Sequence, residues 1–193
     1  HAWLLMRLGK ADASLAAARR SVELDPVSSP AYNNLGAMYS YAGKPLLAVD
    51  ASKASLALTP DNMSAKTNLA LTYSDLGNMP LAIRTAEEAA RDASADAFTQ
   101  ATLGYIYGKA GRKPDAEKAL ASLQRMEDSS PYLVATVYAG MGDKERAFDA
   151  LERAVKAHDD LVPDLGVDPV FSDMRDDPRM LRLLKMMGLP TGA

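Results

Sequence analysis

Apolar and small side chains recur along the chain at helical spacing, and the same order of residues returns about every 34 positions. Within residues 29–60, Tyr32, Leu35 and Tyr39 lie three or four positions apart, so one helix face carries all three. Gly43 then interrupts the pattern, small residues follow, and a proline closes the unit. This order predicts two short helices joined by a tight turn.

The turn glycine returns at Gly9, Gly77 and Gly111, and the flanking pattern returns with it. A further copy arrives a few residues early, and its first helix should begin at Pro131. Small residues such as Gly36 and Ala82 recur where paired helices must cross closely. The expected helices of the preceding copies cover residues 1–8 and 12–24, 30–42 and 45–58, 63–76 and 79–92, and 97–110 and 113–126.

This order of large, small, aromatic, turn, small and proline residues resembles the tetratricopeptide repeat. The resemblance implies an all-α fold, a right-handed superhelix or α-solenoid of about five helix-turn-helix repeats with a C-terminal capping helix. The expected segments are a partial repeat at 1–28, repeats at 29–62, 63–96, 97–127 and 128–158, and a linker with the capping helix at 159–193.

The expected capping helix begins with an N-cap and a first-turn proline at Asp177-Pro178. Met180 and Leu184 belong to its apolar face, and Gly188 is a helix-end signal. Because the exposed end of a solenoid needs a polar-backed cap, this helix should cover the last repeat.

A more specific resemblance covers residues 130–155 and 167–190. These stretches are similar to the C-terminal end of a bacterial family in which tetratricopeptide arrays follow a winged-helix DNA-binding domain, a Ser/Thr protein kinase or a nucleotide cyclase. Met180 departs from the family, which usually has an aromatic there. The resemblance implies a sensing or scaffolding array of a larger bacterial signalling or transcription-regulatory protein. The expected location is the bacterial cytoplasm, or the periplasm if that larger protein spans a membrane.

Composition narrows the function. The absence of cysteine excludes disulfides, thiolate metal sites and cysteine nucleophiles. A net charge of −3 and a pI of about 5.4 argue against nucleic-acid contact, which usually needs a basic face. No apolar run reaches the roughly 20 residues that cross a bilayer, so no membrane contact is expected. Since the sequence opens within a predicted helix, we expect it to be cut from a longer protein.

Candidate catalytic and metal-binding residues are sparse. The histidines, His1 and His158, have no carboxylate cluster at ligand spacing, so no metal site or cofactor is expected. Adjacent carboxylates at 159–160 and 176–177 fit helix capping better than acid–base chemistry. No nucleophile–base pair is evident, and we expect a protein without enzymatic activity.

The remaining prediction is a binding face. First helices of stacked repeats should line a concave groove that holds a peptide or protein segment. Tyr105 should present its ring there, whereas Tyr107 should belong to the core. Two alternatives stay open: Phe98 and Tyr132 pack between repeats, or the asparagines bond only to neighbouring helices. The candidate partner-binding residues are Asn33, Asn34, Tyr41, Asn68, Leu71, Asp75, Phe98, Tyr105, Lys109 and Tyr132.

Two other functions compete with peptide binding. Trp3, Leu4 and Leu8 would be exposed at the N-terminal end and could join two copies as a homodimer. The groove could instead hold a small ligand and act as a sensor. The sequence leaves the three alternatives open.

Overall fold

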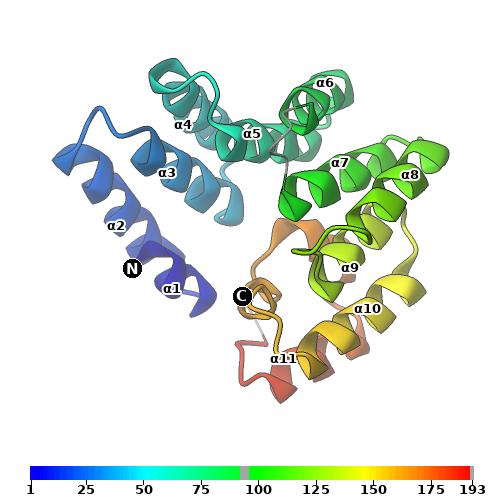
Figure 1. The fold of residues 1–193 in the computed structure, drawn as a ribbon. Helices are drawn as coiled ribbons and strands as arrows, with labels where there is room; N and C mark the ends of the chain where they lie inside the picture. Colours follow the sequence, from blue (N-terminus) through cyan, green and yellow to red (C-terminus); the bar gives the residue numbers. More distant parts are fainter. Residues whose placement is uncertain (92–95, 192–193) are drawn as a thin grey trace. The chain divides into compact units, whose positions relative to one another are not determined.

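The computed structural model describes residues 1–91 and 96–191, and within these residues every regular element is helical. The chain divides into two compact units, His1–Asp92 and Ala93–Ala193. Figure 1 shows the helices of each unit in chain order. In the described residues no helix is both long enough and apolar enough to cross a bilayer.

The first unit consists of antiparallel helix pairs that pack side by side, α1 with α2, α3 with α4 and α5 with α6 (Figure 1). Neighbouring pairs meet where α3 contacts α2 and where α5 contacts α4. The helices of this unit are α1 (Ala2–Arg7), α2 (Ala11–Leu24), α3 (Ser29–Tyr41), α4 (Pro45–Leu58), α5 (Met63–Asp75) and α6 (Met79–Ala90).

Local signals explain where these helices begin and end. The Ser28 side chain accepts a hydrogen bond from Ala31 N at 3.3 Å and caps α3, and Asn78 caps α6 in the same way. Gly43, between α3 and α4, has a φ of 66°, which only glycine adopts without strain. The helix bounds agree with the predicted ranges to within a few residues because these signals act locally.

Small residues let the paired helices approach closely, as predicted. A Cβ added at Gly36 would lie 2.9 Å from Ser52 Oγ on the partner helix, and Ala82 is fully buried. A polar contact joins α3, α4 and the start of α5: Ser29 Oγ donates to Ser55 O at 3.0 Å, and Asn62 Nδ2 donates to Ser29 Oγ at 2.9 Å. The polar residues before α5 therefore satisfy buried hydroxyl groups.

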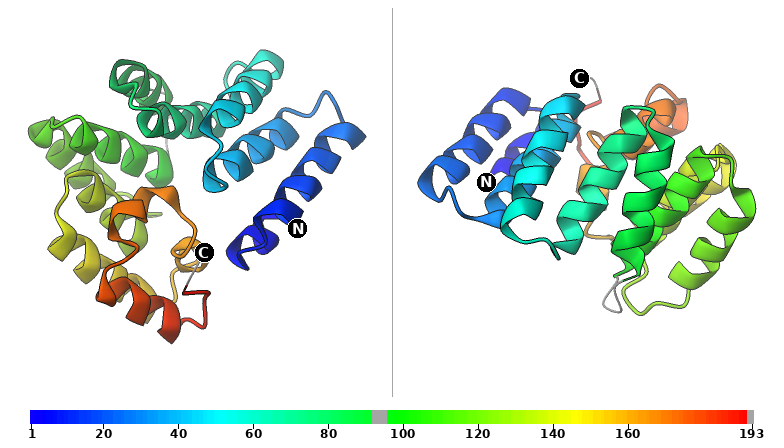
Figure 2. Two further views of the ribbon diagram at one scale, coloured as in Figure 1. Left: turned by 180° about the vertical axis from the view of Figure 1, so that it is seen from behind. Right: turned by 90° about the horizontal axis from the view of Figure 1, so that it is seen from above.

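The second unit contains two helix pairs in residues 96–158, followed by a C-terminal segment that folds back onto them. Both views of Figure 2 show this segment, drawn in orange to red, lying against the helices of its own unit. The elements of this unit are α7 (Ala97–Lys109), α8 (Lys113–Leu123), α9 (Pro131–Gly140), α10 (Lys144–Lys156), the 3-10 helices η1 (Val162–Asp164) and η2 (Pro169–Met174), and α11 (Pro178–Met186).

The helices α7 and α9 cross at glycines. A Cβ added at Gly108 would lie 2.5 Å from Gly140 C, and one added at Gly140 would lie 2.6 Å from Tyr105 Cα. The two backbones therefore touch directly. The repeat spacing does not reveal this contact, because a glycine near a predicted turn does not show which neighbour it meets.

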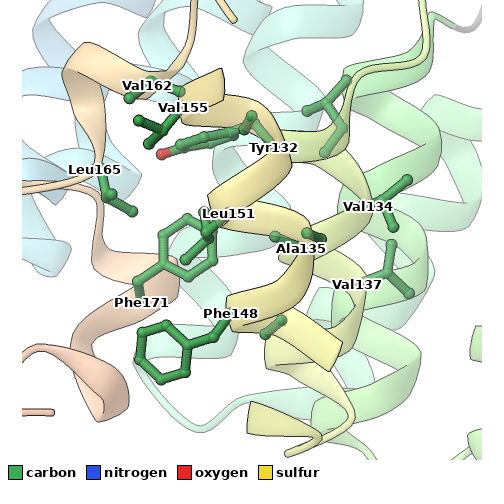
Figure 3. Packing of buried hydrophobic residues seen from close by; sticks show 14 of the residues in the cluster. Tyr132, Val134, Ala135, Val137, Phe148, Leu151, Val155, Val162, Leu165 and Phe171 are labelled. Carbon is green, nitrogen blue, oxygen red and sulfur yellow. The ribbon is translucent and has the colours of Figure 1, made fainter. Parts of the chain in front are cut away.

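Residues 159–167, directly after α10, were expected to be a linker, but two of their apolar side chains, Val162 and Leu165, are buried. Val162, Leu165 and Phe171 are buried in the hydrophobic core of the second unit, together with Leu151 of α10 (Figure 3). The short η1 and η2 helices place these apolar side chains on one side. The linker is thus part of the core rather than a spacer.

The helix α11 begins after Asp177, as predicted, and packs on α10 with Met180 and Leu184 buried. Arg179 fastens its start: it pairs with Glu145 of α10 at 2.8 Å and lies 4.1 Å from the Phe148 ring centroid. The Arg179 guanidinium and backbone N–H both bond to Asp177 and lower the pKa of its carboxyl to about 2.

Candidate functional site

One face of the first unit carries a ladder of polar contacts between first helices. Asn68 Nδ2 of α5 donates to Asn33 Oδ1 of α3 at 2.9 Å, and both residues are half-buried. Two turns further along the same helices, Ser40 Oγ donates to Asp75 Oδ2 at 3.5 Å. Helical spacing places Asn33 and Ser40 on one side of α3 and Asn68 and Asp75 on one side of α5.

The amide pair keeps capacity for a ligand. An asparagine side chain has two donor hydrogens and an acceptor oxygen. The observed bond uses one donor of Asn68 and the oxygen of Asn33, so Asn33 Nδ2 and Asn68 Oδ1 can still bond to a peptide backbone. The structure thus agrees with the alternative that Asn68 bonds to a neighbouring helix, and this bond orients the amides.

An aromatic pair lies beside this ladder. Trp3 of α1 and Tyr41 of α3 meet edge to face, with ring centroids 5.2 Å apart and planes at 83°. Tyr41 follows Ser40 and lies about 80° around α3 from Asn33, on the adjoining side of the helix. The same face also has the half-buried Leu71 of α5. Apolar and hydrogen-bonding groups therefore occur on one surface of three neighbouring helices.

Asn34 lies apart from the amide pair. It occupies the same repeat position as Asn68, and both were predicted to contact a partner. The structure pairs Asn68 with Asn33 instead, and Asn34 is exposed. Adjacent first helices are shifted along each other, so the residue that meets Asn68 is Asn33 and not Asn34 at the equivalent repeat position.

In the second unit the corresponding face is covered by the chain itself. Tyr132 of α9 donates its hydroxyl to Asp168 Oδ2 at 2.8 Å, and its ring meets Phe171 edge to face at 5.3 Å. Figure 3 shows the Tyr132 ring directed toward the segment that carries Leu165 and Phe171. The predicted groove residue Tyr132 is therefore engaged within the unit.

The same segment reaches the end of α7. Lys109 Nζ pairs with Asp173 Oδ2 at 3.4 Å, and Lys144 Nζ donates to the Asp173 backbone oxygen at 2.7 Å. Lys109 was predicted to contact a partner in the groove. In the structure its ion-pair partner is Asp173 of the C-terminal segment.

For two aromatic residues, Tyr105 and Tyr132, the predicted exposure to a partner is wrong. Tyr105 is 4% exposed and Tyr132 is 3% exposed, so neither ring is open to a partner. Gly140 brings α9 onto the backbone of Tyr105, and the C-terminal segment covers Tyr132. Phe98, 41% exposed, is the predicted aromatic of α7 that is accessible.

Tyr107, expected in the core, is only half-buried. The guanidinium of Arg112 lies 4.5 Å from the centroid of its ring, a cation–π contact at the turn after α7. The faces of Tyr105 and Tyr107 were therefore assigned in the wrong order, since Tyr105 is the more deeply buried of the two.

Two other kinds of site, a metal centre and a ligand cleft, were considered in the described residues. In residues 1–91 and 96–191, no group of three or more histidines and carboxylates could hold a metal ion. A cleft of about 370 Å³ opens beside α5 and α6, with Leu69 and Tyr73 among its apolar lining residues and Arg84 and Glu88 among its charged ones. It lies among α4, α5 and α6 and does not include the amide pair.

These features define a class of protein, the solenoid built from antiparallel helix pairs in tandem. The family model described as tetratricopeptide repeat matches residues 38–98. The remaining pairs follow the same antiparallel pattern, and the fold is that of a tetratricopeptide-repeat solenoid. A search of curated protein sequences finds no match.

Solved structures share this fold. A thermophilic tetratricopeptide-repeat protein of Thermus thermophilus is 24% identical, with a TM-score of 0.69 over 84% of this chain and 91% of that chain. MamA is 19% identical, with a TM-score of 0.54 over 79% of this chain and 91% of that chain. YrrB, described as a tetratricopeptide protein with an unusual peptide-binding site, is 21% identical, with a TM-score of 0.50 over 84% of this chain and 86% of that chain.

Proposed function

We propose that the protein is an interaction module that holds an extended peptide or protein segment on the first-helix face of its first unit. The tetratricopeptide fold supports a protein–protein interaction scaffold. The observation that carries the proposal is the pair Asn33–Asn68, which has the aromatic pair Trp3–Tyr41 beside it. YrrB, a protein of similar fold, is described as having a peptide-binding site, which is consistent with this use.

The chemistry favours an extended segment. An extended backbone has N–H and C=O groups that need partners, whereas a helical peptide has already bonded them internally. Asn33 Nδ2 can donate to such a carbonyl, and Asn68 Oδ1 can accept from an N–H. Trp3 and Tyr41 offer apolar ring surface to a side chain of the same segment. The second unit is less suited, because its own C-terminal segment occupies the equivalent face.

The wider role follows from the sequence resemblance. Arrays that resemble residues 130–155 and 167–190 occur after DNA-binding, kinase or cyclase domains in bacterial regulators. We propose that this module brings a partner to such an effector domain, as part of bacterial signalling or transcription regulation. It would act without its own catalysis, nucleic-acid contact or cofactor.

Selection of random peptides displayed on phage against the immobilised chain tests the proposal. Peptides that bind the chain should lose about tenfold or more in affinity for Asn68→Ala and for Trp3→Ala, as hot-spot residues do. Lys53→Ala, on the exposed side of α4, is the matched control and should bind them with unchanged affinity. Equal binding by all three variants, with unchanged melting temperatures, would place the site elsewhere.

Self-association is a second candidate function, favoured by exposed apolar residues on α1. Leu4 is 58% exposed and Leu8 is 49% exposed. Two copies that met through α1 would bury both side chains. Light scattering over a concentration series separates the two functions, because only self-association raises the molar mass with concentration.

A further inference from the structure

The first-helix face of the second unit has an occupant from the same chain. Residues 168–173 cross α9 and reach the end of α7, and they do so through side chains of three kinds. Asp168 bonds to Tyr132, Phe171 packs on the Tyr132 ring, and Asp173 meets Lys109 and Lys144. Tyr132 and Lys109 belong to the first helices α9 and α7, whose first-unit counterparts carry the amide and aromatic pairs, whereas Lys144 begins the second helix α10.

We propose that this face is a recognition site for short acidic segments with an aromatic residue, spaced as Asp168, Phe171 and Asp173 are. The chain's own C-terminal segment is its tethered occupant. A segment of the same chemistry, supplied by a partner protein, can bind in its place. The proposal concerns the second unit alone and does not depend on peptide binding by the first.

The contacts of Asp168 explain why the site would prefer a segment with a carboxylate at this position. It is buried, and both of its oxygens have a partner: Oδ2 accepts from the Tyr132 hydroxyl at 2.8 Å, and Oδ1 accepts from Val170 N at 3.0 Å. A segment with a neutral apolar residue here would leave the buried Tyr132 hydroxyl without this partner, which is costly.

Phe171 and Asp173 make the other contacts between the segment and this face. Phe171 is 1% exposed, and its edge-to-face contact with Tyr132 requires an aromatic ring of that size. The Asp173 side chain is exposed, so its ion pair with Lys109 contributes little to affinity and mainly fixes the orientation of the segment. Lys144 adds a bond to the Asp173 carbonyl, which any residue there would supply.

The occupant can leave without the rest of the tail. The backbone bonds of η2 are local, such as Phe171 N to Asp168 O and Arg175 N to Ser172 O. The following helix has its own attachment to α10 through Arg179 and Glu145. Local opening of short elements is common in folded proteins, and here it would break the contacts of Asp168, Phe171 and Asp173 together. A tether of this length gives an effective concentration in the millimolar range, so a free competitor binds weakly while the tether is intact.

The test uses the full chain and a fluorescein-labelled synthetic peptide of residues 162–177. The acceptor is a chain whose own segment is disabled by Asp168→Ala, Phe171→Ala and Asp173→Ala, with Tyr132 and Lys109 unchanged. Fluorescence anisotropy should show saturable binding at least tenfold tighter than to the unaltered chain. A peptide with Phe171→Ala should bind at least tenfold more weakly, and so should the labelled peptide when Tyr132→Phe is added to the acceptor.

Circular dichroism decides whether the disabled chain is folded. If its helix signal matches that of the unaltered chain and the peptide does not bind at millimolar concentration, the proposal is wrong. If it does not fold, hydrogen exchange on the unaltered chain decides. The amides of Phe171 and Arg175 should exchange at least tenfold faster than those in the middle of α9. Exchange of both sets only with global unfolding would show an inseparable core and overturn the proposal.

Discussion

Replacing Gly140 by alanine would place a methyl group where two helix backbones touch. The added Cβ would lie 2.6 Å from Tyr105 Cα and 2.9 Å from Tyr105 C. Both atoms belong to the backbone of α7, so no side chain can rotate away to make room. The reciprocal change at Gly108 would meet Gly140 C at 2.5 Å and Met141 N at 2.6 Å.

The cost can be worked from these distances. Ordinary contacts of a Cβ begin near 3.4 Å, so α7 and α9 would have to separate by roughly 1 Å. Overpacking a close contact costs about 1–3 kcal/mol and sometimes more. Alanine returns about 1 kcal/mol at most through its higher helix propensity. We therefore expect Gly140→Ala to lower the free energy of unfolding by about 1–2 kcal/mol.

Urea unfolding followed by circular dichroism measures this loss, and Gly104→Ala on the same helix pair is the matched control. A Cβ at Gly104 would meet the Val137 side-chain methyl groups at 3.0 Å, and these can shift. Its loss should be clearly smaller. A stability for Gly140→Ala equal to that of the unaltered chain, or a larger loss for Gly104→Ala, would refute the backbone-contact argument.

Two further predictions concern the C-terminal half. His158 has a φ of 53°, so His158→Gly should raise stability by up to about 1 kcal/mol in thermal melts, whereas His158→Ala should not. Asp177, whose pKa Arg179 lowers to about 2, stabilises the fold above pH ~4, the unfolded value, and loses this effect as the pH falls toward 2. Asp177→Asn should flatten stability across that window in urea unfolding; parallel pH profiles would contradict this.

The helices could be predicted from the sequence because their signals are local. Pro45 and Pro131 begin α4 and α9, where a fixed φ helps and the missing N–H has no helical partner. Gly77 and Gly111 adopt the left-handed φ that ends the first helix of a pair. Each signal acts within a few residues, so the repeat spacing in the sequence predicts the start and end of each helix to within a few positions.

The binding faces could not be predicted in the same way. Tyr105 follows the repeat register of a groove residue, yet its burial depends on Gly140, which approaches from the next pair. Tyr132 also lies at a repeat position that predicts a groove residue, but Asp168, from the segment after the last repeat, covers it. Contacts between distant segments depend on how neighbouring helix pairs are shifted along each other and on where the C-terminal segment packs. The residue spacing within one helix pair contains no information on either.

The two units show how one repeat position can serve two purposes. Asn33 and Tyr132 each lie one turn before the small residue of a first helix, Gly36 or Ala135. Asn33 bonds to the next first helix through Asn68 and keeps donor capacity, whereas the Tyr132 hydroxyl bonds to the C-terminal segment. Buried polar groups need partners, and here the tyrosine hydroxyl is paired with a carboxylate of the C-terminal segment, while the asparagine is paired with its neighbour. The same repeat position thus contacts a neighbouring first helix in one unit and the C-terminal segment in the other.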